Sequence, residues 1–334
     1  MAGRLGQRLT TLLDADETVG SVVGLDVTEP ARGSRKLEFH RTDITTADLK
    51  PLLEGVHVVV HLVAATAPLG DPVTARRVNV DATRRLLDAA GAASVARFVR
   101  ASSAAVYGAW PNNPSPLTED APLRPNPGFE PAAHDAECER LVLEWVDAHP
   151  GTIAVLLRIA PVVGAGVDSL FAAAAAGRSP VNIKGVERQV QVVHVDDAAS
   201  ALALAVTGDL RGAYNVAATG SLSSTEAAAV VGGARRHPSV PEAVAARTLR
   251  TLWKSGLGEV PPQVLPYLVH SWVIANDRLR AAGWEPKYSS EEALLLSGDP
   301  DAARSSLPWV AAVGAVLTGA AGATWWLTRH RSKR

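Results

Sequence analysis

VHVVVHLVA, residues 56–64, is a run of apolar residues interrupted only by two histidines. A half-exposed strand alternates apolar and polar residues, whereas a strand buried on both faces is apolar almost throughout. The stretch is therefore predicted to be a strand of a parallel sheet covered on both faces.

Strand-like and helix-like segments alternate on both sides of this run. Residues 3–15 have leucines at i, i+4, i+7 and i+8, the spacing of one helix face. Further strands are expected over 21–27, 36–44, 96–108 and 152–164, and further helices over 46–55, 74–93 and 136–150. Alternation of this kind implies right-handed crossovers. The predicted fold is α/β, a doubly wound, Rossmann-like parallel sheet with a smaller, mostly helical substrate domain.

Part of a dinucleotide-binding motif lies at the start of the chain. Gly3-Arg4-Leu5-Gly6 opens a predicted helix, and backbone N–H groups at such a position bind phosphate. Asp26 ends the next strand about 20 residues later, where an acidic side chain accepts hydrogen bonds from the adenosine ribose. A carboxylate there repels a 2′-phosphate, so NAD is favoured over NADP. The alternatives are an ordinary helix start and an ordinary strand-end aspartate.

Eight stretches, in this order, resemble the extended short-chain dehydrogenase/reductases, the NAD-dependent epimerase/dehydratase family. They are GRLG, VVGLDV, RTDIT, HLVAA, VNVDATRRLL, ASSAAVYG, LRIAPVVG and VVHVDDAASAL, within roughly residues 1–290. The cofactor-binding residues that the resemblance implies are Gly3, Leu5, Gly6, Asp26, Asp43, Ile44, Val63, Ala64, Asn79 and Ser102.

The resemblance also implies particular roles. Asp43 and Ile44 would bracket the adenine, Val63 and Ala64 would line the cofactor trough, and Asn79 would lie near the nicotinamide ribose. The implied catalytic residues are Ser103, as the active-site hydroxyl, and Tyr107, which would point into the substrate cleft. Arg158 would sit beside that cleft, although Asn79 and Arg158 could instead be capping or ion-pairing residues.

The Tyr-Lys catalytic pair of the family is missing. Alignment of the helix AECERLV places Pro131 at the tyrosine and Asp135 at the lysine. Proline has no proton to give, and an aspartate repels the phenolate and phosphates that a lysine attracts. His134 is the one nearby side chain that titrates near neutrality, and a surface histidine is the simpler interpretation. Glu130, Glu137 and Glu139 are predicted to form a solvated helix face.

The family's first strand, which precedes the glycine motif, is also missing from the sequence. Loss of a central strand would leave backbone groups unpaired, at about 1–3 kcal/mol for each buried group. We therefore expect that Met1 is not the natural start, and that roughly 5–6 residues plus a turn lie upstream.

Composition narrows the kinds of partner. A net charge of −1 gives no reason to expect nucleic acid, because phosphate binding requires a concentrated positive field. Cys138 is the single cysteine, which excludes an internal disulfide and a multi-cysteine zinc site, and the nine histidines show no metal-ligand spacing. We predict no metal, and a small-molecule substrate.

The C-terminal part contains a candidate membrane helix. LPWVAAVGAVLTGAAGATWWL, residues 307–327, has no charged residue, and about 20 apolar residues cross a bilayer. Tryptophans lie at both ends and the basic RHRSKR follows. A buried alanine-rich helix is the alternative. The positive-inside rule would keep the basic tail in the cytosol, which would place the N-terminal domain across the membrane. The chain opens without an export signal, however, so we expect a membrane-anchored protein with its main domain in the cytoplasm.

The expected domains are a Rossmann-like NAD-binding domain (1–164), substrate-domain elements with returning strands (165–297), a linker (298–306), the transmembrane helix (307–328) and a basic tail (329–334). One functional hypothesis is an NAD-dependent epimerase/dehydratase-type oxidoreductase for a nucleotide sugar or a lipid-like alcohol. The other is a catalytically inactive, membrane-anchored NAD-binding or scaffold protein. The resemblance further suggests a homodimer through the helices at 74–90 and 136–148.

Overall fold

A four-stranded parallel sheet forms the centre of the computed structural model, which describes residues 1–62, 71–167, 171, 182–231, 239–255 and 261–297. The strand order is β10-β5-β4-β3, with β3 at Val58–His61, β4 at Arg97–Ser103, β5 at Ile153–Ile159 and β10 at Gly212–Val216. Within the apolar run at 56–64, residues 58–61 form a parallel strand, as predicted. The expected burial on both faces is not complete, because Val59 and His61 are buried whereas Val58 and Val60 are half-buried.

The two preceding strands form a separate parallel pair. In this pair β1 (Val22–Asp26) runs beside β2 (Leu37–Arg41), with Val22 opposite Leu37. Within the described residues, no strand is hydrogen-bonded between β1 and β3. The sheet is thus divided at the place where the glycine motif would have its first strand.

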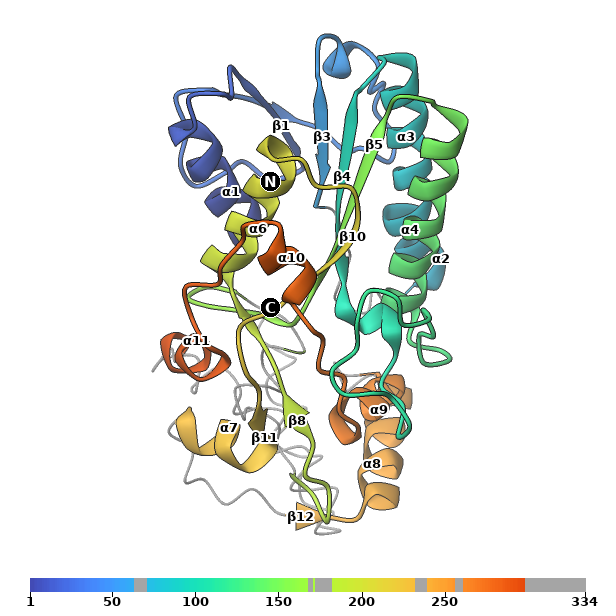
Figure 1. Ribbon diagram of the computed structural model, residues 1–334. Coiled ribbons are helices and arrows are strands. Elements are labelled where there is room, and N and C mark those ends of the chain that lie inside the picture. Colours follow the sequence, from blue (N-terminus) through green and yellow to red (C-terminus); the bar gives the residue numbers. More distant parts are fainter. Residues whose placement is uncertain (63–70, 168–170, 172–181, 232–238, 256–260, 298–334) are drawn as a thin grey trace, which may run out of the picture.

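Helices cover both faces of the main sheet (Figure 1). On one side α1 (Arg4–Ala15) packs against α6 (Val195–Thr207). On the other side lie α2 (Pro72–Arg76), a π-helical turn (Arg77–Asp81), α3 (Ala82–Ala92) and α4 (Glu130–Ala148). This arrangement confirms the predicted doubly wound fold. The helix expected over 46–55 is only a short 3-10 turn, Pro51–Leu53, because Pro51 cannot donate a helical hydrogen bond.

Side chains of the central strands alternate between two hydrophobic clusters. On β4, Phe98 contributes to the cluster under α3 and α4, and Val99 to the cluster on the opposite face. On β5, Leu156 and Leu157 divide in the same way. Successive strand residues point to opposite faces, so two covered faces require the continuous apolar runs seen in the sequence.

The residues after β5 combine short strands with short helices. Paired strands are β6 (Val162–Val163) with β9 (Val193–His194), β8 (Gln189–Val190) with β11 (Leu222–Ser223), and β7 (Asn182–Ile183) with β12 (Ser239–Val240). The helices are α7 (Ser224–Val230), α8 (Glu242–Lys254), α9 (Leu265–Val269), α10 (Asp277–Ala281) and α11 (Ser290–Leu296). This part is therefore less purely helical than predicted, and the domain boundaries remain predictions.

None of the helices in the described residues is long and apolar enough to cross a bilayer. The candidate membrane segment at 307–328 lies outside the described residues, as do the linker and the basic tail. The prediction of a membrane anchor is therefore untested by this fold.

Candidate cofactor and substrate site

Asp26 lies at the carboxyl end of β1, where the sequence places it. Its carboxylate accepts hydrogen bonds from the Met1 ammonium, from the Ala2 N–H at 2.7 Å and from the Thr28 N–H at 3.1 Å. Burial alone would raise the pKa of Asp26, but these donors outweigh it and hold the pKa below its ordinary value. The side chain is thus an ionised acceptor at the strand edge, which fits a ribose hydroxyl.

The N-terminus of α1 lies beside this carboxylate. Gly3 is the N-cap and has no side chain to satisfy the first-turn N–H groups. A Cβ at Gly6 would come within 2.5 Å of the Met1 carbonyl oxygen, so only glycine allows this approach of two backbone segments. First-turn amides without a side-chain cap fit a phosphate. Leu5, in contrast, is half-buried and packs against the core.

Asp43 and Ile44, which are expected to bracket the adenine, lie in different surroundings, one at the surface and one in the core. Asp43 is exposed and accepts hydrogen bonds from the Thr45 N–H and hydroxyl at 2.8 and 2.7 Å, which lower its pKa. Ile44 is 9% exposed and packs with the cluster under α3 and α4, so most of its side chain is turned away from any ligand. Val63 and Ala64 lie outside the described residues.

The two serines at the end of β4 face different surroundings. Ser102 is buried and donates a 2.6 Å hydrogen bond to Glu139. Its hydroxyl is therefore engaged inside the protein, and its predicted contact with the cofactor stays a prediction. Ser103 is half-buried, and its hydroxyl accepts a hydrogen bond from the Ala105 N–H at 3.1 Å. Ser103 therefore remains at the open edge of the strands, where its hydroxyl also caps the 3-10 turn Ala104–Tyr107.

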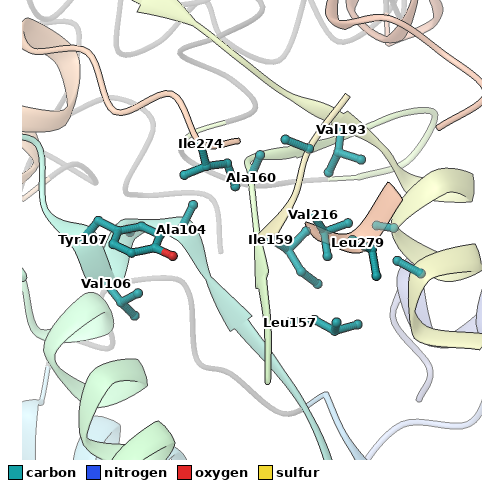
Figure 2. Close-up of a cluster of buried hydrophobic side chains, with 14 of the residues drawn as sticks. Ala104, Val106, Tyr107, Leu157, Ile159, Ala160, Val193, Val216, Ile274 and Leu279 are labelled. Atoms are coloured by element: carbon teal, nitrogen blue, oxygen red, sulfur yellow. The ribbon is translucent and has the colours of Figure 1, made fainter. Parts of the chain in front are cut away.

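Tyr107 does not point into a cleft. Figure 2 shows its ring among buried side chains such as Ala104 and Val106, and none of its surface is exposed. Its hydroxyl donates to Asn215 at 2.7 Å and accepts from Arg158 at 2.8 Å. Burial raises the pKa of Tyr107, although the Arg158 charge opposes the rise. The expected direction of Tyr107 into a substrate cleft is therefore contradicted, because its hydroxyl is enclosed between Asn215 and Arg158, and its catalytic role stays a prediction.

Arg158 joins Tyr107 to a buried carboxylate. It binds Glu139 at 2.9 Å and donates to the Glu119 carbonyl oxygen, also at 2.9 Å. Glu139 is 1% exposed, so its predicted place on a solvated face is wrong. The same network corrects the expected position of Arg158 beside a substrate cleft. An arginine within the apolar strand IAVLLRI was the available signal for a buried partner.

Pro131 and Asp135 occupy the positions predicted from the sequence on α4. Pro131 lies in the first turn of the helix, where its missing N–H costs nothing. Asp135 forms a 2.7 Å ion pair with Arg100, and Arg100 also contacts His61 at 3.3 Å. Burial raises the pKa of Asp135 to about 6, with Arg100 opposing the rise. Sequence reasoning missed Arg100, whose position inside the strand RFVRASS was its only signal.

His134 is an interhelical residue. It is 5% exposed, and its Nδ1 lies 3.3 Å from the Asn79 amide nitrogen. Its other nitrogen lies 3.6 Å from Glu130, and burial lowers the pKa of the imidazole. The interpretation of His134 as a surface residue is therefore wrong. Asn79 lies in the π-helical turn, directed at α4, with its side chain 4% exposed.

A pocket begins where β4 and β5 end and continues into the second part of the chain. The free space in it is about 400 Å³, a figure that includes volume open to solvent. Its lining comprises Ala104, Ala160, Pro161, Phe171, Arg188, Gln189, Val190, Gln191, Tyr267, Leu268, Trp272 and Val273. Arg188 forms no ion pair with any described residue, and burial lowers its pKa to about 10. This cation was also missed, because nothing in its sequence context distinguishes it from a surface arginine.

Comparison with known proteins agrees with this architecture. An uncharacterised protein of Mycobacterium tuberculosis is 28% identical over 302 residues, which cover 86% of this chain and 79% of the relative. A UDP-glucose 4-epimerase of Mycolicibacterium smegmatis is 38% identical over 138 residues, 37% of this chain and 43% of that protein. The structure of a Thermus thermophilus UDP-glucose 4-epimerase in complex with NAD superposes with a TM-score of 0.65 at 26% identity, covering 89% of this chain and 95% of that one.

The sequence model of the NAD dependent epimerase/dehydratase family matches residues 1–217. This span includes Asp26, the serines of β4 and the helix with Pro131 and Asp135. The predicted cofactor, NAD, is that of the family. The chain belongs to the NAD-dependent epimerase/dehydratase family.

Proposed function

We propose that this protein binds NAD across the carboxyl edge of its parallel strands and a nucleotide sugar in the adjoining pocket, without the Tyr-Lys proton transfer of its family. The observation that carries the proposal is Arg188, a cation in an otherwise largely apolar pocket with no carboxylate partner among the described residues. A buried cation without a partner is costly, and an anionic ligand group such as a diphosphate would offset that cost.

The adenosine half of NAD fits the residues present. Asp26 offers an ionised acceptor, and the first turn of α1 offers unsatisfied N–H groups within the same region. Ala104 and Ala160 directly follow β4 and β5, so the pocket opens at the same edge of the sheet. A dinucleotide and a second ligand can therefore meet there.

The residues expected near the nicotinamide half do not supply the acid-base pair that the family uses for catalysis. Pro131 and Asp135 stand where the family's acid-base pair would be, and Asp135 is engaged by Arg100. Tyr107 is buried in a separate network. Since a positioned general acid or base contributes roughly 10²–10⁴-fold to rate, turnover is expected to be lower than that of a Tyr-Lys relative by about this factor.

The test is calorimetric titration of the purified full-length protein with NAD and then with UDP-sugars, followed by absorbance at the NADH band. We expect both ligands to bind, and Arg188→Gln to weaken the sugar nucleotide without weakening NAD. An exposed arginine on α8, changed in Arg247→Gln, is the matched control. Absence of NAD binding would overturn the proposal, and turnover at the rate of a Tyr-Lys enzyme would overturn its catalytic part.

A membrane location is part of the same proposal. It is supported by the uncharged stretch 307–327, its terminal tryptophans and the basic residues behind it. The main domain is proposed to lie in the cytoplasm. Fractionation of cells should recover the full chain with membranes and a variant ending at Ser306 in the supernatant. Equal distribution of the two proteins would contradict the anchor.

A further inference from the structure

Two ion pairs connect α4 to the central strands, and they are oriented differently. Asp135 and Glu139 lie one helical turn apart, and each meets an arginine of a neighbouring strand. In the pair with Arg158, the carboxylate of Glu139 is the deeper group, with exposures of 8% and 1%. In the pair with Arg100 the order is reversed, because the arginine has no exposed surface and 14% of the Asp135 side chain is exposed. The Arg100–Asp135 pair therefore presents its negative end outward.

The position of this pair follows from the strands. Arg100 is the register partner of His61, the last residue of β3. A dinucleotide whose ribose is held by Asp26 at the end of β1 crosses the α1 N-terminus and reaches the carboxyl ends of β3 and β4 with its second half. Asp135 lies on the helix that covers those strands, so the nicotinamide half is the ligand part nearest to it.

The other charged groups around Asp135 offset its charge only in part. Glu139 is paired with Arg158, and Arg100, the ion-pair partner of Asp135, is the more deeply buried of the two groups. His61 is neutral, because burial and the Arg100 charge hold its pKa well below the ordinary value. On the exposed side of this pair the carboxylate is therefore the nearer charge, and Arg100 reduces its field without reversing it.

NAD⁺ and NADH differ at the ring by one positive charge and share every other binding group. We infer that Asp135 makes this site selective for the oxidised coenzyme, by placing a carboxylate beside the cationic nicotinamide. The inference rests on the proposed function, because it requires NAD to bind. It adds a discrimination between redox forms, set by Asp135 with Arg100 as its positioning residue.

The experiment compares dissociation constants for NAD⁺ and NADH, by calorimetry and by NADH fluorescence, on the full-length protein. The wild type should bind NAD⁺ more tightly, and Asp135→Asn should reduce the NAD⁺/NADH affinity ratio roughly tenfold, the effect of one charge several ångströms away at an effective dielectric constant near 20. Asp147→Asn removes an exposed carboxylate from the far end of the same helix and should leave the ratio unchanged.

A double variant, Arg100→Gln with Asp135→Asn, removes both charges and avoids an unpaired buried cation. It should lower the NAD⁺/NADH affinity ratio in the same direction but by less than the single variant, because the positive charge of Arg100 is removed together with the carboxylate. Tight binding of both coenzymes with a ratio that neither variant changes would overturn the inference alone. A wild-type protein that binds neither coenzyme would overturn the proposed function as well.

Discussion

At the scale of single residues, Glu137 and Glu139 show how position on one helix decides the role of a carboxylate. Glu137 lies at the surface and binds Arg76 and Arg84 at 2.8 and 3.1 Å. Glu139, two residues later, is enclosed with Arg158 and Ser102. Both are glutamates in an AECERL segment, so composition alone does not separate them.

Glu139→Gln should lower the free energy of unfolding by about 3–5 kcal/mol, because it leaves the Arg158 charge buried without its partner. The same substitution at Glu137 should cost at most about 1 kcal/mol, since exposed ion pairs contribute little. Urea unfolding of both variants measures the difference. Equal losses would contradict the assignment of Glu139 to a buried network.

Tyr107→Phe should lower the free energy of unfolding by about 1–3 kcal/mol, because the hydroxyl satisfies both Asn215 and Arg158. NAD affinity should not change, since the ring is enclosed in the core. Tyr214→Phe is the control, because its hydroxyl makes only a 3.5 Å contact with the Arg211 N–H. A selective loss of ligand binding in Tyr107→Phe would restore a functional role for this residue.

Titration of Asp135 should make the free energy of unfolding depend on pH. Burial raises its pKa from an ordinary 3.8 to about 6, so between these two pH values the folded state holds a proton that the unfolded state has lost. This contribution to stability is fully present below the ordinary pKa of 3.8 and is lost as the pH rises through the folded pKa of about 6. Unfolding of Asp135→Asn should therefore show a less negative slope than the wild type between these two values. Parallel curves would contradict the raised pKa.

At the scale of elements, the separation of β1 and β2 from the main sheet has a measurable consequence. β4 is hydrogen-bonded to strands on both sides, whereas β1 is paired only with β2 within the described residues. Backbone groups that share fewer ladder bonds open with a smaller free energy. Amide hydrogen exchange should be faster in Val22–Asp26 than in Arg97–Ser103. Equal protection would mean that another segment completes the sheet.

The elements were predictable where a regular pattern carries the signal. Leu9 and Leu13 of the first helix are buried as their spacing predicted, and the apolar runs at 96–103 and 153–159 are the central strands. The helix expected at 46–55 was not, because Pro51 interrupts it. Local patterns report local structure, and these are the cases in which they suffice.

At the scale of the whole molecule, the site was less predictable than the fold. Asp26 and Ser103 lie at the strand edge as expected, whereas Tyr107, Ser102 and His134 are enclosed. Their surroundings depend on residues far away in the sequence, such as Asn215 for Tyr107, which is 108 positions away. The order of the strands in the sheet determines which distant residues become neighbours. The hydrophobic periodicity of the sequence does not show which side chain of a strand will face which helix.

The divided sheet also bears on how this protein behaves in concentrated solution. An open strand edge is a template on which another chain can add its own backbone, unless charge or covering segments prevent it. Within the described residues β3 has a strand on one side only, and it carries three consecutive valines and a neutral histidine rather than lysines. We therefore expect self-association that grows with protein concentration and begins at the β3 edge during purification and storage.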